Sequence, residues 1–228
     1  MAQETRSTLN NMTIYQVYVR NHGPNGTFAD VQADLDRIQA LNVDVVYFMP
    51  IHPIGQLNKK GSLGCPYSTK DYRAINPEYG TEADFRALVA DIHNRGMKVM
   101  IDVVYNHTAH DAVYIDEHPD WYHVDENGKP FTTVPAWSDV IDLKHPNEEL
   151  WEYLIGSLTY WVGLGVDGFR CDVASLLPVR FWQRAREACA LINRETMWLT
   201  ESVHMNFVRE RRREGLFAIS DGELYQAF

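Results

Sequence analysis

The chain has 228 residues, of which 45% are hydrophobic and 23% are charged, and its formal net charge is −10. This composition excludes collagen-like, coiled-coil and disordered chains. The acidic balance and the lack of a basic block argue against a nucleic-acid or membrane-surface partner. No apolar run approaches the ~20 residues of a membrane helix, and the first residues carry no hydrophobic signal segment. Three sparsely spaced cysteines (Cys65, Cys171 and Cys189) predict neither a disulfide framework nor a zinc site, so we expect a cytoplasmic protein.

The first part of the chain alternates between strand and helix patterns. A strand is predicted at 14–20, a helix at 28–40 and a second strand at 43–49. The second strand is nearly all apolar, as expected of a parallel strand that is covered on both faces. A connection rich in Gly, Pro and Asn follows at 50–80, and it is too long to be a simple link.

The next helix begins at Thr81, where Asp84 completes a capping-box pattern, and it ends at Gly96. A third strand is predicted at 97–105. It leads into a second long excursion at 106–145, which is rich in His, Asp and Pro. We predict that 106–145 forms a small, irregular inserted subdomain.

The remaining predicted elements are, in chain order, helix 147–163, strand 166–171, helix 178–193, strand 197–201, helix 205–214 and strand 216–220. Six strands that alternate with helices predict an α/β fold, with a parallel sheet and crossover helices. A closed (β/α)8 TIM barrel has eight such units. The sequence therefore predicts a barrel that is incomplete in this chain, formed by 1–105 and 146–228. The alternative is an open, doubly wound sheet, although no glycine-rich phosphate loop follows any strand.

Three successive predicted strands end in chemically active side chains. They are Asp102, Asn106 and His107 at the end of the third strand, Arg170 and Asp172 at the end of the fourth, and Glu201 at the end of the fifth. In a parallel barrel the catalytic groups lie where strands end and loops begin. We therefore expect these side chains to form one site.

Strand geometry makes the expectation more specific. Arg170 and Asp172 share one face of their strand, ~6.6 Å apart, and the guanidinium is expected to keep Asp172 ionised. Glu201 belongs to the neighbouring strand, ~4.8 Å across, so its carboxyl group can approach that of Asp172. A carboxyl pair ~5–5.5 Å apart fits a retaining glycosidase, whereas ~6.5–9.5 Å leaves room for the water of an inverting enzyme. Placement on adjacent strands favours retention.

Each of these residues also has a structural explanation. Asp102 alternatively serves only to neutralise Arg170, since a buried charge needs a partner. His107 alternatively is an ordinary loop histidine, and Glu201 a solvated charge at a strand end. His107, His110 and Asp111 suggest a metal cluster, but no complete ligand set accompanies them. The joint appearance of ionisable groups at three strand ends favours a catalytic site.

Four segments resemble signature regions of the α-amylase family, glycoside hydrolase family 13. In the family's order they are CPYSTKDYRAINPEYGT at 65–81, DVVYNHT at 102–108, GFRCDVA at 168–174 and TES at 200–202. By this resemblance Asp172 is the nucleophile that forms a glycosyl-enzyme ester, and Glu201 is the general acid and then the base. The other implied roles are substrate binding for Tyr67, His107 and Arg170, and structural support for Asp102 and Asn106. Asn106 is also a calcium ligand in many relatives. The resemblance requires no cofactor, allows calcium and assigns no metal site.

The chain also departs from the family pattern. The family's fourth region, a Phe…Asn-His-Asp motif after strand seven, is missing, and Ser175 and Leu176 replace a Lys-His pair found in many members. The chain therefore resembles the N-terminal portion of the catalytic domain, and we expect it to be weakly active or inactive alone. Exposed barrel edges would favour self-association.

The resemblance leads to a retaining α-glucan hydrolase as the main functional hypothesis, acting on an α-glucan or oligosaccharide. A transglycosylase of the same family would use the same two carboxyl groups, because water and sugar compete for one intermediate. A non-catalytic carbohydrate-binding fragment is the third alternative.

Overall fold

The computed structural model describes residues 9, 11–202 and 222–224. Its main sheet has six parallel strands, which lie side by side in chain order. They are β1 (Ile14–Val17), β2 (Val45–Phe48), β3 (Lys98–Val103), β6 (Gly168–Cys171), β7 (Met197–Glu201) and β8 (Gly222–Leu224). A doubly wound sheet would contain a point where the strand order reverses, and this order has none. The predicted α/β fold of the barrel type, with six strands in the sheet of the described residues, is therefore confirmed.

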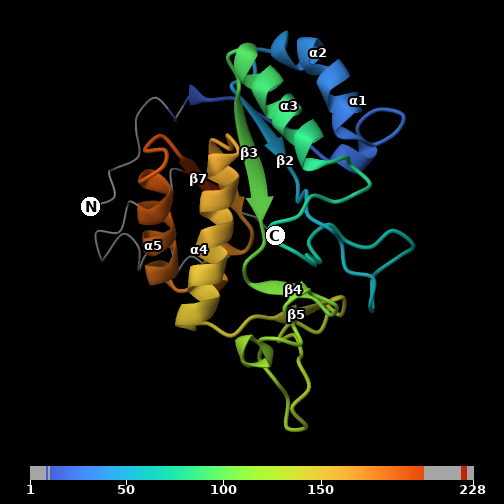
Figure 1. The fold of residues 1–228 in the computed structure, drawn as a ribbon, viewed down its shortest axis with the longest axis vertical. Coiled ribbons are helices and arrows are strands. Elements are labelled where there is room, and N and C mark those ends of the chain that lie inside the picture. The colour runs from blue at the N-terminus through green and yellow to red at the C-terminus, as the bar shows by residue number, and fades with distance from the viewer. Residues whose placement is uncertain (1–8, 10, 203–221, 225–228) are drawn as a thin grey trace.

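The helices follow the strands as crossover connections. They are α1 (Phe28–Ala33), α2 (Leu35–Gln39), α3 (Glu82–Asn94), α4 (Glu148–Gly163) and α5 (Val179–Ala190), with short 3-10 turns η2 (Val19–Asn21), η3 (Pro119–Trp121) and η4 (Ala174–Leu176). The capping box predicted for α3 is present: Thr81 accepts a hydrogen bond from the Asp84 amide, and the Asp84 carboxylate accepts one from the Thr81 amide. α3 packs beside α1, and α4 beside α5 (Figure 1). No helix in the described ranges is long and apolar enough to cross a membrane.

Several predicted elements differ from the structure in extent, and two of these differences have a local cause. The predicted helix 28–40 is interrupted at Asp34, whose side chain accepts hydrogen bonds from Arg37 and whose backbone separates α1 from α2. The predicted strand 14–20 ends at Val17, because the chain turns there into η2. The predicted helix 205–214 and strand 216–220 lie outside the described residues, and the sixth strand that is described is β8.

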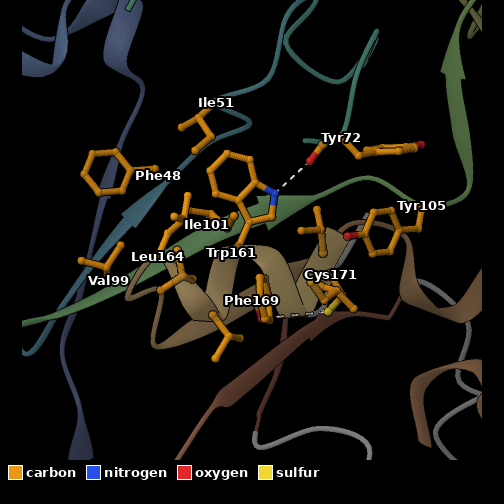
Figure 2. Packing of buried hydrophobic residues seen from close by; sticks show 14 of the residues in the cluster. Phe48, Ile51, Tyr72, Val99, Ile101, Tyr105, Trp161, Leu164, Phe169 and Cys171 are labelled. Carbon is orange, nitrogen blue, oxygen red and sulfur yellow. Dashed lines mark hydrogen bonds between the residues drawn. The ribbon is translucent and has the colours of Figure 1, made fainter. Parts of the chain in front are cut away.

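The outer face of the sheet forms the main core with the helices. Phe48, Ile101 and Phe169 come from three adjacent strands and are fully buried there. Figure 2 shows these side chains around Trp161 of α4. The indole N–H of Trp161 donates a hydrogen bond of 2.8 Å to the carbonyl oxygen of Tyr72, which fastens α4 to the connection after β2 (Figure 2).

The inner face of the sheet has a smaller core of its own. Val45, Tyr47, Met100 and Met197 form a separate buried cluster there. Side chains alternate along a strand, so the inner residues that follow Met100 and Gly168 are Asp102 and Arg170, two positions further on. The inner face thus changes from apolar to charged towards the carboxyl ends of the strands.

The excursion at 106–145 begins where β3 ends. It contains a two-stranded antiparallel sheet of β4 (His107–Ala109) and β5 (Val140–Asp142), which lies beyond the arrowhead of β3 in Figure 1. This sheet is more regular than the sequence analysis expected. Its division from the barrel at 106 and 145 as a separate subdomain stays a prediction.

Candidate active site

A cleft of about 620 Å³ lies at the carboxyl ends of β3, β6 and β7. Five predicted site residues line it: Tyr67, His107, Arg170, Asp172 and Glu201. The two predicted supports, Asp102 and Asn106, are buried with exposed fractions of 0% and 8%. The structure therefore brings together side chains that are separated by up to 134 residues. Their positions at strand ends predicted this for all of them except Tyr67, which the family resemblance indicated.

Arg170 is the centre of the charged cluster. Its Nη1 atom donates hydrogen bonds to Asp102 Oδ1 and Oδ2, both at 3.0 Å, and to Asp172 Oδ1 at 2.8 Å. Its Nη2 atom lies 3.0 Å from Glu201 Oε1. Burial alone would lower the pKa of Arg170, but the Asp102 carboxylate, together with Tyr47, Asp172 and Tyr67, outweighs burial and the pKa is raised. One cation therefore serves three carboxyl groups.

Asp102 is held from three sides. Besides Arg170, the hydroxyl of Tyr47 donates to Asp102 Oδ2 at 2.5 Å and that of Tyr67 donates to the same oxygen at 3.1 Å. Burial nevertheless raises the pKa of Asp102 to about 6, against the opposing effect of the guanidinium. Tyr47 was missed by the sequence analysis, although its inner-face position on β2, in register with Met100, is a signal that could have identified it.

The protonation expected for Asp172 is corrected by the structure. Arg170 makes the predicted contact, but burial, followed by the charges of Asp102 and Glu201, raises the pKa of Asp172 well above its ordinary value. With one cation and three carboxyl groups, ionising every carboxyl would leave two uncompensated negative charges in a buried site. These groups titrate together, so the cluster retains a proton more readily than separate carboxyl groups would.

Glu201 is oriented by the backbone next to Asp172. The amide of Val173 donates to Glu201 Oε2 at 2.9 Å. Val173 has φ +36° and ψ +43°, the left-handed conformation that β-branched residues avoid. The sequence analysis missed this contact because valine does not signal a left-handed turn. Strain of this kind persists where surrounding contacts maintain it, and here it aims an amide at a carboxylate.

His107 is a buried, neutral residue. Burial lowers its pKa to about 4, and its Nδ1 atom lies 3.2 Å from Asn106 Nδ2. Because the amide nitrogen donates, Nδ1 accepts and the ring proton is assigned to Nε2. The ring also packs against Trp137, with 5.3 Å between centroids and 54° between planes.

The side chains that suggested a metal cluster in the sequence have other partners in the structure. In the described part of the chain, no three His, Cys, Asp or Glu side chains lie close enough together to hold a metal ion. His110 contacts the carbonyl of Ser138, whereas Asp111 pairs with Lys70, so these residues have separate partners. The calcium-ligand role of Asn106 stays a prediction, and no chemical step below uses a metal.

The cleft wall joins the two long excursions of the chain. Lys60 Nζ lies 2.7 Å from Asp139 Oδ1 and donates to the carbonyl of Ala136 at 2.6 Å. Ser68 Oγ donates to the carbonyl of Asp139 at 2.8 Å. These contacts were not predicted, because they link loops whose sequences show no periodicity.

Comparisons with known proteins agree with this geometry. The family model described as the alpha-amylase catalytic domain matches residues 5–133. An alpha-1,4-glucan:maltose-1-phosphate maltosyltransferase of Rhodospirillum rubrum is 38% identical over 178 residues, covering 69% of this chain and 26% of that enzyme. An alpha-amylase structure from Lactobacillus plantarum is 50% identical with a TM-score of 0.86, covering 92% of this chain and 50% of that one. The structure of the maltogenic alpha-amylase AmyB from Thermotoga neapolitana is 39% identical with a TM-score of 0.81, covering 88% of this chain and 48% of that one.

The fold and the charged cluster thus define a barrel protein of the glycoside-active class. The chain belongs to the alpha-amylase family, as its sequence motifs indicated. It spans about a quarter of the length of the Rhodospirillum relative and about half of the two solved structures.

Proposed function

We propose that this chain carries the nucleophile and the acid/base of a retaining enzyme that acts on α-glucans or their oligosaccharides. Asp172 attacks the anomeric carbon while the bond from that carbon to the leaving oxygen breaks, and Glu201 gives its proton to that oxygen. In the second step Glu201 takes a proton from the incoming hydroxyl, whose oxygen displaces Asp172 from the anomeric carbon. Each step conserves protons, and the two steps together restore the starting enzyme.

The observation that carries this proposal is the sharing of one guanidinium by Asp172 and Glu201 inside the cleft. Among the described residues, Arg170 bonds Oδ1 of Asp172 and no donor bonds Oδ2, which leaves that oxygen for attack. The mechanism requires one proton in the cluster before each leaving group departs, and the buried, interacting carboxyl groups retain one. Water is restricted in such a site, so these electrostatic interactions are stronger than in solution.

The remaining site residues act by binding and orientation. Arg170 orients Asp172 and stabilises its anion, and Asp102 keeps Arg170 in place. Tyr67 and neutral His107 provide an aromatic ring and a ring edge at the reacting sugar, as the family resemblance implies.

In the second step, we favour the hydroxyl of another sugar over water as the acceptor of the glycosyl unit, so the reaction would be transfer rather than hydrolysis. The curated relative from Rhodospirillum is a maltosyltransferase, and the cleft carries apolar side chains beside the acid/base, which suit a sugar face better than water. Hydrolysis is the second candidate, favoured by the 50% identical alpha-amylase from Lactobacillus plantarum.

The experiment that tests the proposed function is trapping of the ester. A 5-fluoro maltosyl fluoride would be incubated with the protein, and the peptides would be mapped by mass spectrometry. We expect one added glycosyl unit on the peptide that contains Asp172, and none in Asp172→Asn. In Glu201→Gln the adduct forms from this activated donor but accumulates, because the base that completes turnover is missing. A label on a different peptide, or an Asp172→Asn variant that is labelled like the wild type, would overturn the proposal.

Several expectations remain predictions. These are the cytoplasmic location, self-association through sheet edges, the absence of a nucleic-acid partner, the absence of a required cofactor, and weak or no activity of this chain alone. All three cysteines are unpaired in the structure.

A further inference from the structure

Residues 56–64 form the tip of the long connection after β2, and both ends of this tip are fastened. At its start the Gln56 amide donates to Asp111 Oδ1, at the root of the second excursion, at 3.1 Å. Near its end Arg20 Nη1 donates to the Leu63 carbonyl at 3.3 Å. The position of the tip between these two ends depends on the contacts that its central residues make.

The two lysines at the centre of the tip have different partners. Lys59 Nζ donates to Gln56 Oε1 at 2.7 Å, so its contact stays within the tip. Lys60 Nζ instead reaches the second excursion, where it lies 2.7 Å from Asp139 Oδ1 and donates to the carbonyl of Ala136 at 2.6 Å. Adjacent lysines with an internal and an external partner provide a matched pair for experiments.

The contact between Lys60 and Asp139 joins a buried group to an exposed one. The side chain of Asp139 is 4% exposed, whereas that of Lys60 is 47% exposed. In the described part of the chain no other cation pairs with Asp139, and a buried carboxylate needs a partner. A half-exposed lysine loses side-chain freedom when it is held, and water screens its charge. The contact is therefore important to Asp139 and yet weak enough to open.

Both partners of this contact line the cleft. Lys60 lies on one wall together with Cys65 and Tyr67, and Asp139 belongs to the second excursion. Burial raises the pKa of the Cys65 thiol, on which the charges of Asp139, Lys60 and Asp172 also act. The thiol therefore lies close to both the Lys60 contact and the nucleophile, and it can report whether the two walls separate.

The charged cluster is held independently of the tip. Arg170, Asp172 and Glu201 lie at the ends of β6 and β7 and contact one another. Movement of the tip therefore changes how the walls enclose a sugar chain but leaves the reacting groups in place. Walls that are joined before binding spare the complex the cost of ordering them.

We propose that Lys60 is a positioning residue that latches the two excursions together, so that this side of the cleft is closed before an oligosaccharide binds. The latch acts on the affinity for the sugar chain and not on the chemical step. The inference deepens the proposed function and rests on it for the trapping kinetics alone; closure of the cleft wall does not require activity.

Closure is tested by the reaction of Cys65 with two uncharged reagents, the small N-ethylmaleimide and the bulky N-(1-pyrenyl)maleimide. Both react with the same thiolate, so the ratio of the bulky to the small rate constant does not depend on the pKa of the thiol. Peptide mapping identifies the labelled cysteine. Cys171 and Cys189 are fully buried, so their labelling would report general unfolding.

We expect Lys60→Met to raise the ratio of the two rate constants about fivefold, the factor that corresponds to a contact of ~1 kcal/mol. Lys60→Arg keeps the charge and the donors, so it should retain the ratio of the wild type. The matched control Lys59→Met removes the same charge from the same turn and should also leave the ratio unchanged. An unchanged ratio in Lys60→Met would overturn the latch.

Positioning is tested by the trapping reaction with 5-fluoro maltosyl fluoride. We expect Lys60→Met to raise the half-saturating concentration of this donor about fivefold and to leave the maximal rate of ester formation unchanged. Lys60→Arg and Lys59→Met should match the wild type. A lower maximal rate at an unchanged half-saturating concentration would show that Lys60 acts on the chemical step, which contradicts the positioning role.

The outcomes separate the two proposals. If the maleimide ratio rises in Lys60→Met while the sugar label falls on a peptide that does not contain Asp172, the latch is supported and the proposed function is contradicted. If the ester forms on Asp172 with the same half-saturating concentration in both proteins and the maleimide ratio is unchanged, the function is supported and the latch is overturned.

Discussion

The Nη1 atom of Arg170 lies 3.0 Å from both carboxylate oxygens of Asp102, its register partner on the neighbouring strand. Both side chains are almost fully buried, so each needs the other's charge. Because Arg170 also contacts Asp172 and Glu201, the two partners are not equivalent. Loss of the Arg170 guanidinium leaves three carboxyl groups without a cation. Loss of Asp102 still leaves Arg170 with two carboxyl partners.

This asymmetry predicts unequal effects of mutation. Arg170→Met should lower the free energy of unfolding by about 3–5 kcal/mol at neutral pH, the usual cost of stranding buried charge. Asp102→Asn keeps the shape and should cost clearly less. Urea unfolding of both variants beside the wild type measures the difference. Equal losses would show that Arg170 interacts mainly with Asp102 and not with the whole cluster.

The raised pKa of Asp102 predicts how stability depends on pH. Its ordinary value of 3.8 is raised to about 6 by burial. A group with a raised folded pKa stabilises the fold where it is protonated, below about pH 4, and this contribution is lost as the pH rises through about 6. The unfolding free energy of the wild type minus that of Asp102→Asn should therefore fall between about pH 4 and about pH 7.

The expected fall is about 3 kcal/mol, since a tenfold change in proton affinity corresponds to about 1.4 kcal/mol. Asp102→Asn also removes a charge that raises the pKa of Asp172, which acts in the same direction. Denaturant unfolding of both proteins across this pH range measures the difference. A difference that rises with pH would contradict the assigned direction.

Much of this site could be predicted from the alternation of side chains along strands. Asp102 and Arg170 are register partners because each lies at an inner position of its strand, and β7 has the predicted bounds Met197–Glu201. The capping box at Thr81 could also be predicted, because it joins two residues that are three positions apart in the sequence. Such features depend on residues that are close in sequence, or on the alternation of side chains between the two faces of a strand.

Other features depend on information that a single sequence does not carry. The bond from Tyr47 to Asp102 requires the register between β2 and β3, and the bridge from Lys60 to Asp139 requires the paths of two irregular loops. The raised pKa of Asp172 requires the depth of burial, which outweighs the nearby guanidinium. These are effects of tertiary packing rather than of local pattern.

Gly168 provides a test of the packed layer below the charged cluster. A Cβ atom at this position would lie 2.9 Å from both the Cβ and the carbonyl oxygen of Met197, which belong to the neighbouring strand. Gly168→Ala should therefore destabilise the protein by about 1–3 kcal/mol, as overpacked cores usually do. Arg170 lies two residues further along the same strand, so activity should fall as well.

The matched control is Gly163→Ala, because a Cβ atom there meets nothing within 4 Å and the residue is the last of α4. We expect this variant to be neutral or up to about 1 kcal/mol more stable. Thermal unfolding of both variants gives the comparison. Equal stability of the two would show that β7 moves away without cost.

The left-handed conformation of Val173 predicts that glycine gives a more stable protein than alanine at this position, the reverse of the usual order. Alanine ordinarily stabilises a folded chain relative to glycine, because glycine loses more backbone freedom on folding. At φ +36° the order reverses, since a Cβ atom is strained there and glycine is not. Val173→Gly should therefore be more stable than Val173→Ala by about 1 kcal/mol, although both lose the buried valine methyl groups.

The same pair of variants tests the link from this turn to the acid/base. Both keep the amide that donates to Glu201, so the position of Glu201 depends on how well the turn keeps its left-handed conformation. Glycine adopts that conformation without strain but also samples others, whereas alanine retains the strain. We expect the alanine variant to be both less stable and slower in the acid-dependent step, measured with unactivated maltooligosaccharides. An alanine variant that is both more stable and equally active would show that the left-handed turn is not strained and does not position Glu201.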